Sequence, residues 1–100
     1  MVIHIVMWNF KSEVAEEKKE ALKEGMKVNL EGLVGQVPGL LEASYVAHPL
    51  PGTTHDMALI TSFDSEVSLK GYKNHPSHVH VADTFVRPYT TNRACLNFNK

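Results

Sequence analysis

The sequence predicts an α+β domain whose elements follow the order β-α-β-β-α-β, with the four strands in one antiparallel sheet. Three observations lead to this prediction. Runs rich in β-branched and aromatic residues alternate with amphipathic helical segments. Clusters of Pro and Gly separate these runs. A hydrophobic share of 43% over 100 residues is typical of one globular domain, so we expect residues 1–100 to form a single unit.

The charge composition argues against nucleic-acid and membrane partners. Ten Lys and Arg against eleven Asp and Glu give a formal charge of -1, which provides no field to attract a polyanion. The apolar residues 1–10 lack a preceding basic segment and end at Lys11, so we expect neither a signal peptide nor a membrane helix. Because the single Cys95 has no partner for an internal disulfide, we expect a cytoplasmic protein.

Residues 2–10 are predicted to form the first strand. The segment is β-branched and aromatic, contains no Gly or Pro, and is short for a helix. Neither face of this strand is polar, so we expect both faces to be covered. One face carries Val2, His4, Val6, Trp8 and Phe10, and the other carries Ile3, Ile5 and Met7.

The first helix is predicted to begin after Ser12, whose side chain can cap it, and to end at Pro38-Gly39. A single apolar stripe with the helical period indicates that one side lies on the core. The stripe consists of Leu22, Met26, Leu30, Leu33 and Val37. On the solvated side, i, i+3 spacing predicts two ion pairs, Glu16 with Lys19 and Glu20 with Lys23.

The rest of the chain is predicted to supply three strands and a second helical region. Residues 40–46 and 57–63 form strands, and the Pro-rich stretch 48–54 between them is a loop. Asp64 and Ser65 offer caps for a helix that stops before Pro76, because the residue before a proline is excluded from the α region. Pro76 opens a new helical turn that runs to Phe85. The last strand covers residues 93–98.

This order, with antiparallel pairing of the strands, is the ferredoxin-like arrangement, in which helices cover one face of the sheet. The other face is left bare. Since the strands at 2–10 and 57–63 are apolar on both sides, we expect the bare face to pack against the same face of a second copy. The sequence therefore predicts a homodimer, with Val6 and Leu59 in its dry core.

The second helical region contains the motif Tyr72-x-x-His75-Pro76-x-His78, which follows Phe63-Asp64-Ser65. Together with the opening run Val2–Trp8, the turn Val37-Pro38-Gly39 and the run Asp56–Leu59, this motif resembles the stress-responsive A/B barrel family, also called Dabb. The similarity extends from residue 2 to about 98. It implies a dimeric α+β barrel, in which the sheets of two ferredoxin-like subunits face each other around a core that holds a ligand cavity in some members. Some members are associated with stress responses.

The resemblance also implies a candidate catalytic site. One plant member of the family is a polyketide cyclase that catalyses an intramolecular aldol condensation without a cofactor. Its acid/base positions match Tyr72 and His78, and a first-strand histidine of its cavity matches His4. A further cavity histidine in its third strand corresponds to Met57 here, and His55 lies two positions earlier.

The chemistry of these residue types fits such a role. A neutral imidazole accepts a proton α to a carbonyl near neutral pH, and a phenol hydroxyl stabilises the enolate oxygen. The bend at His75-Pro76 is expected to bring Tyr72 and His78 together around one cavity, whereas His80 points elsewhere. The expected ligand-binding residues are Val6, Trp8, Leu59 and His75.

A structural interpretation stays open for each of these residues. His75 and His78 can donate to backbone carbonyls at the bend, while Tyr72 packs in the core. His4 can be a hydrogen-bonded core histidine on an otherwise apolar strand.

Metal and thiol chemistry are not expected. The spacing of His75, His78 and His80 matches no standard zinc site and no Cys lies near it, so the sequence predicts neither a metal nor a cofactor. Cys95 lies in a strand without an obvious base beside it, and we expect a buried, inert thiol.

Three functions remain open. The first is a stress-associated homodimer that binds a small apolar or keto-containing ligand without turnover. The second is a cofactor-independent cyclase or lyase, and the third is a cofactor-free monooxygenase, by analogy with other dimeric α+β barrels. A solvent-connected cavity shared by His4, Tyr72 and His78 favours the enzymes, and a filled barrel favours the first function.

Overall fold

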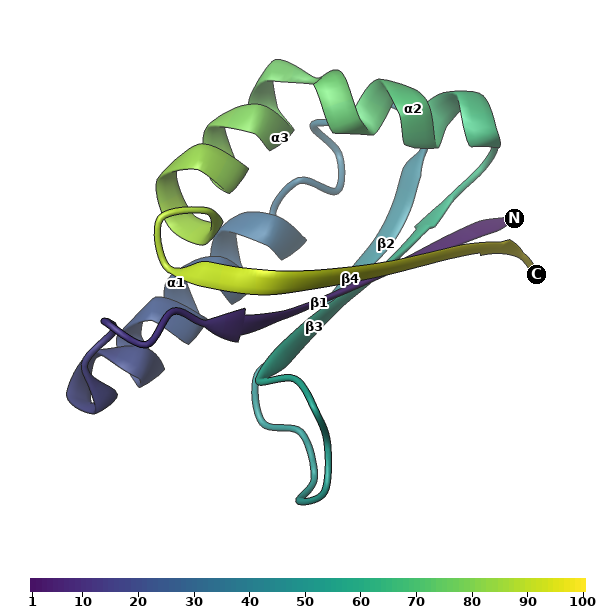
Figure 1. The fold of residues 1–100 in the computed structure, drawn as a ribbon. Helices are drawn as coiled ribbons and strands as arrows, with labels where there is room; N and C mark the ends of the chain where they lie inside the picture. Colours follow the sequence, from purple (N-terminus) through teal and green to yellow (C-terminus); the bar gives the residue numbers. More distant parts are fainter.

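The computed structural model describes residues 1–100 and consists of one sheet with helices on one face (Figure 1). All strand pairs are antiparallel, in the order β2-β3-β1-β4. This architecture confirms the predicted ferredoxin-like fold. In chain order the elements are β1 (Val2–Phe10), a 3-10 turn (Glu16–Lys18), α1 (Lys19–Glu31), β2 (Leu40–Val46), β3 (Met57–Phe63), α2 (Glu66–Asn74), α3 (Pro76–Val81), a π-helical turn (Ala82–Val86) and β4 (Thr90–Asn99).

The covered face of the sheet forms the core of the protomer. Val6 lies opposite Leu59 on the neighbouring strand, and these two side chains are 3% and 2% exposed. They belong to one apolar cluster with Met26 and Leu30 of α1. The expectation that Val6 and Leu59 lie in a dimer core is therefore wrong. Side chains alternate along a strand, and the helices cover the face to which Val6 and Leu59 point.

The opposite face of the sheet is bare and apolar, as expected. Ile5 of β1 lies between Ile60 of β3 and Leu96 of β4. Ile60, Leu96 and the nearby Phe98 are 39%, 62% and 42% exposed. An exposed apolar surface of this kind is typical of an association site.

A β-bulge in β4 decides which side chains of that strand face the helices. Met7 pairs with Ala94 and Asn9 with Thr91, so two residues, Asn92 and Arg93, lie opposite the single Trp8. Asn92 has a φ of 55°, and its side-chain amide donates to Asn9 Oδ1 at 2.8 Å. One extra residue exchanges the two faces for the rest of the strand. Arg93, Cys95 and Asn97 therefore face the helices, and Leu96 and Phe98 lie on the bare face.

The first helix is shorter than predicted. It begins with the 3-10 turn at Glu16, without a side-chain cap, and the hydroxyl of Ser12 donates to the Glu13 carboxylate instead. It ends at Glu31, and the turns that follow contain Gly35 with a φ of 90°, a conformation that excludes a continuous helix as far as Val37. Leu33 and Val37 are still buried. The two predicted ion pairs are present, Glu16 with Lys19 at 3.1 Å and Glu20 with Lys23 at 3.7 Å.

The second helical region follows the prediction closely. The Ser65 hydroxyl caps α2 by accepting from the Ser68 amide at 3.2 Å. His75 is extended, which ends α2, and Pro76 occupies the first turn of α3. None of the helices has both the length and the hydrophobicity that a bilayer-spanning segment needs.

The bulge gives a first prediction. We expect Asn92→Val to lower the free energy of unfolding by about 1–2 kcal/mol, because a β-branched residue is strained at positive φ. Asn92→Gly, which adopts this conformation freely, should stay close to the wild type. Urea denaturation followed by circular dichroism measures both variants. Equal stability of Asn92→Val and the wild type would contradict the bulge.

Candidate functional site

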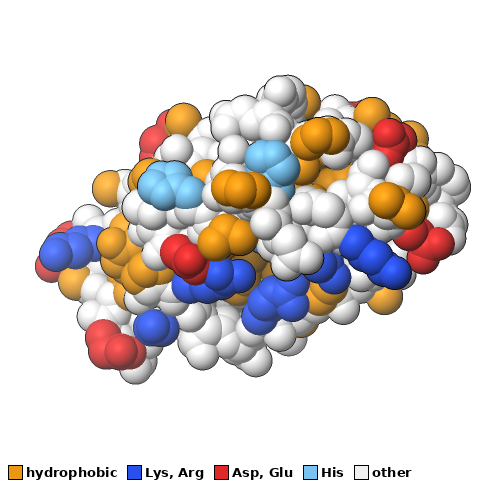
Figure 2. Space-filling model, turned by 90° about the horizontal axis from the view of Figure 1, so that it is seen from above, with side chains coloured by type: hydrophobic (Ala, Val, Ile, Leu, Met, Phe, Trp, Pro, Cys, Tyr) orange, Lys and Arg blue, Asp and Glu red, His pale blue; other side chains and the backbone are white.

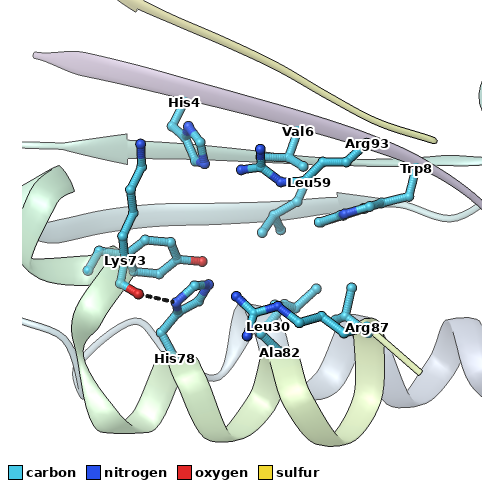
Figure 3. Close-up of a pocket in the computed structure, with 12 residues that line it drawn as sticks. His4, Val6, Trp8, Leu30, Leu59, Lys73, His78, Ala82, Arg87 and Arg93 are labelled. Carbon is cyan, nitrogen blue, oxygen red and sulfur yellow. Dashed lines mark hydrogen bonds between the residues drawn. The ribbon is translucent and has the colours of Figure 1, made fainter. Parts of the chain in front are cut away.

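A cavity of about 100 Å³ lies between the sheet and the helices of one protomer (Figure 3). The resemblance implied a barrel core between two facing sheets that holds a ligand cavity in some members, whereas this cavity lies on the helix-covered face of one protomer. Twelve residues line it: His4, Val6, Trp8, Leu30, Leu59, Tyr72, Lys73, His78, Ala82, Val86, Arg87 and Arg93. Six of the seven sequence-predicted site residues are among them, and His75 is not.

Tyr72 lies in the second half of α2 and is 2% exposed. Its ring packs edge-on against Phe63 of β3, with ring centroids 5.1 Å apart. The hydroxyl makes no hydrogen bond within the protein and borders the cavity. Burial raises the pKa of Tyr72 to about 12, so the hydroxyl is protonated at neutral pH and free to donate to a ligand.

His78 lies in the first half of α3, directly against Tyr72. The centroids of the two rings are 4.1 Å apart. The ring Nδ1 lies 3.4 Å from the Lys73 carbonyl oxygen, to which it can only donate (Figure 3). In that tautomer Nε2 carries the lone pair. Burial lowers the pKa of His78, so the neutral, basic form prevails at neutral pH.

The bend between α2 and α3 brings these two side chains together. Its residue His75 uses its own ring locally, because Nδ1 accepts from the Ser77 amide at 3.1 Å and so caps α3. His75 is therefore a helix cap and is not in position to bind a ligand in the cavity. His80 borders a different groove, as expected.

His4 contributes a third polar side chain, from β1. It is 3% exposed, and its ring centroid lies 6.5 Å from that of Tyr72. Its Nδ1 is hydrogen-bonded to Asn97 Oδ1, which orients the ring. Burial lowers the pKa of His4.

Cys95 differs from the prediction of a buried thiol, because it is exposed on the edge strand β4. Its Sγ lies 3.6 Å from His4 Nδ1. An edge strand has a neighbour on one side only, so even the side chains on its covered face remain open to solvent there.

Met57, which corresponds to the third-strand cavity histidine of the plant cyclase, and His55, two positions earlier, lie outside the cavity. Met57 is buried in the core, where its sulfur accepts from the Tyr45 hydroxyl at 3.1 Å. His55 is in the loop before β3, with its Nδ1 2.8 Å from the Thr54 hydroxyl oxygen. Neither residue takes the place of a cavity histidine.

Sequence reasoning missed the three cationic residues that line the cavity. Lys73 directly follows Tyr72 in the sequence, and this adjacency could have indicated that Lys73 lies near the cavity. No sequence pattern indicated that the only two arginines of the chain, Arg87 and Arg93, line the cavity. For Arg93, the face of the sheet to which the side chain points depends on the bulge. The structure contains no group of three or more His, Cys, Asp or Glu side chains placed to hold a metal ion.

Residues 2–100 match the stress responsive A/B barrel domain, Dabb. The chain belongs to this family. The match includes the motif from Tyr72 to His78. A comparison with curated proteins finds no significant relative.

Solved structures share the fold. A dimeric protein of unknown function with a ferredoxin-like fold from Bacteroides fragilis is 26% identical, with a TM-score of 0.89 over 99% of this chain and 95% of the other. A Dabb family protein from Mesorhizobium loti is 13% identical, with a TM-score of 0.76 over 99% and 95%. A hydroxynitrile lyase from Passiflora edulis is 19% identical, with a TM-score of 0.71 over 97% and 90%.

Proposed function

We propose that the protein binds a small keto-containing ligand in this cavity and catalyses cofactor-independent proton transfer on it, as lyases and cyclases do. One observation carries the proposal. A protonated phenol and a neutral imidazole lie in ring contact at one cavity, and the phenol hydroxyl has no partner in the protein. A structural pair would use these polar atoms internally, whereas a catalytic pair keeps them for a ligand.

The reaction follows from the two groups. His78 Nε2 takes a proton from the carbon α to the ligand's carbonyl, the electron pair of that C–H bond forms the C=C bond of an enolate, and the π pair of the carbonyl moves to its oxygen. The Tyr72 hydroxyl donates to this oxygen and binds it more strongly as its negative charge grows. Return of the proton, attack of the α carbon on a second carbonyl, or loss of a leaving group completes the reaction. His4, held by Asn97, forms part of the same wall.

The cavity volume limits the ligand. An apolar cavity of about 150 Å³ holds benzene, and this cavity measures about 100 Å³. It therefore encloses the reacting end of a small molecule and not an extended polyketide. Ligand binding without turnover is the second candidate, and the small volume favours it over cyclisation of a long chain. Lyase chemistry occurs on this fold, since one solved structure is named a hydroxynitrile lyase.

We also propose that the protein is a homodimer through the bare face of the sheet. Exposed apolar side chains on β3 and β4, with Ile5 of β1 between them, support this association. Solved relatives are described as dimeric, among them the protein from Bacteroides fragilis. The exposed free thiol of Cys95 fits the reducing environment of the cytoplasm.

Neighbouring residues on β3 test the dimer, because they point to opposite faces. We expect Ile60→Asp to keep the protomer folded and to release a monomer of 11.2 kDa, since it places a charge in the association face. Leu59→Asp should instead unfold the protomer. Light scattering and circular dichroism measure the two effects. Val67→Asp, at an exposed position of α2, is the control that should stay dimeric. A monomeric wild-type protein would contradict the proposal.

Proton transfer is tested by deuterium exchange at the carbon atoms beside the keto group of acetoacetate and levulinate, followed by NMR in heavy water. We expect exchange above the buffer rate, with losses of about 100-fold in His78→Asn and about 10-fold or more in Tyr72→Phe. The matched controls are His80→Asn and Tyr89→Phe, whose side chains do not line the cavity. Exchange at the buffer rate, together with ligand-dependent stabilisation, would assign the protein to ligand binding without turnover.

The pH dependence of this exchange is a further expectation. Only neutral His78 accepts a proton, and its pKa lies below the ordinary 6.5. The rate should therefore be constant around neutral pH and fall as the pH drops through that lowered pKa. Tyr72 stays protonated throughout this range. A rate that rises on acidification would exclude His78 as the base.

A further inference from the structure

Three cationic side chains from separate elements meet at the cavity that holds Tyr72 and His78. Lys73 comes from α2, Arg87 follows the π-helical turn, and Arg93 comes from β4. Figure 3 shows the guanidinium groups of both arginines reaching toward the space between His4 and His78. Seen from above in Figure 2, Lys and Arg side chains gather in a band across the molecule. No Asp or Glu is among the lining residues.

Two of these three cations have no carboxylate partner. The protein forms five ion pairs, and only that between Arg87 and Asp83 involves a lining residue. Lys73 and Arg93 remain unpaired. In a protein with a formal charge of -1, unpaired positive charges gathered at one cavity create a local potential that favours an anion.

The charges also act on the candidate catalytic groups. After burial, Arg87 and Arg93 contribute to the lowered pKa of His78, and Lys73 and Arg93 contribute to that of His4. Arg93 therefore lies within electrostatic reach of both histidines. A positive charge at this position keeps the base neutral and stabilises an enolate.

We propose that the ligand of this cavity is a small keto monocarboxylate, whose carboxylate binds Arg93 with Lys73 or Arg87 beside it. The inference rests on the proposed function and names its substrate class. Arginine presents a planar pair of donors that matches a carboxylate. The apolar wall of Val6, Trp8 and Leu59 suits the short carbon chain, which leaves the keto oxygen for Tyr72. A free inorganic anion would leave that apolar wall unused.

The proposal is tested by isothermal titration calorimetry at low ionic strength with acetoacetate and its neutral isostere acetoacetamide. We expect acetoacetate to bind about tenfold more tightly or better. Arg93→Gln should abolish this preference, and Arg93→Lys, which keeps the charge without the planar donors, should retain part of it. Lys70→Gln, one turn before Lys73 on α2 and outside the cavity, is the matched control and should keep the full preference. Melting temperatures confirm that each variant is folded.

Equal binding of acid and amide overturns the proposal, as does inorganic phosphate that competes as well as acetoacetate. Two further outcomes distinguish a failure of the carboxylate preference from a failure of the proposed proton transfer. Proton exchange on acetoacetamide as fast as on acetoacetate leaves the catalytic pair intact and removes the charge preference. Tight, Arg93-dependent binding of acetoacetate without exchange leaves the charge preference intact and removes the catalysis.

Discussion

The alternation of side chains across the sheet is the constraint on which the cavity and the bare face both depend. In β1 this alternation sends His4, Val6 and Trp8 to the helices and Ile5 to the opposite face. In β4 it would do the reverse without the bulge at Asn92, because an unbroken continuation of the register from Thr91 and Asn9 would turn Leu96 inward and Arg93 outward. The bulge at Asn92 therefore places Arg93 at the cavity and Leu96 and Phe98 on the bare face.

Burial in the cavity favours a hydrogen-bond donor at Tyr72 and a proton acceptor at His78. Burial keeps the Tyr72 hydroxyl protonated and the His78 ring neutral, so a donor and an acceptor lie side by side at neutral pH. The bond to the Lys73 carbonyl selects the tautomer of His78, while the side chain of the same lysine lines the cavity with its charge. A polar pair in such a site stabilises a charge that develops during reaction, and the nearby cations suit one that is negative.

Much of the fold was predictable from local patterns, because the alternation of a strand and the conformational effect of a proline depend only on residues that are close in the sequence. The contact between Tyr72 and His78 was predictable for the same reason, since the bend at Pro76 lies between them. Features that depend on tertiary structure were not. The helix-covered face of β1, which decides the environment of Val6, and the exposure of Cys95 depend on where helices pack. The inward position of Arg93 depends on a one-residue shift in pairing that leaves no periodic signal.

The most direct test of the account is a crystal structure of the protein with levulinate, a keto acid with a single ketone. We expect the ketone oxygen within hydrogen-bond distance of the Tyr72 hydroxyl and an adjacent carbon against His78 Nε2. The carboxylate should lie on Arg93. A ligand bound between the two sheets of a dimer, or in the cavity with its ketone turned away from Tyr72 and His78, would contradict the account.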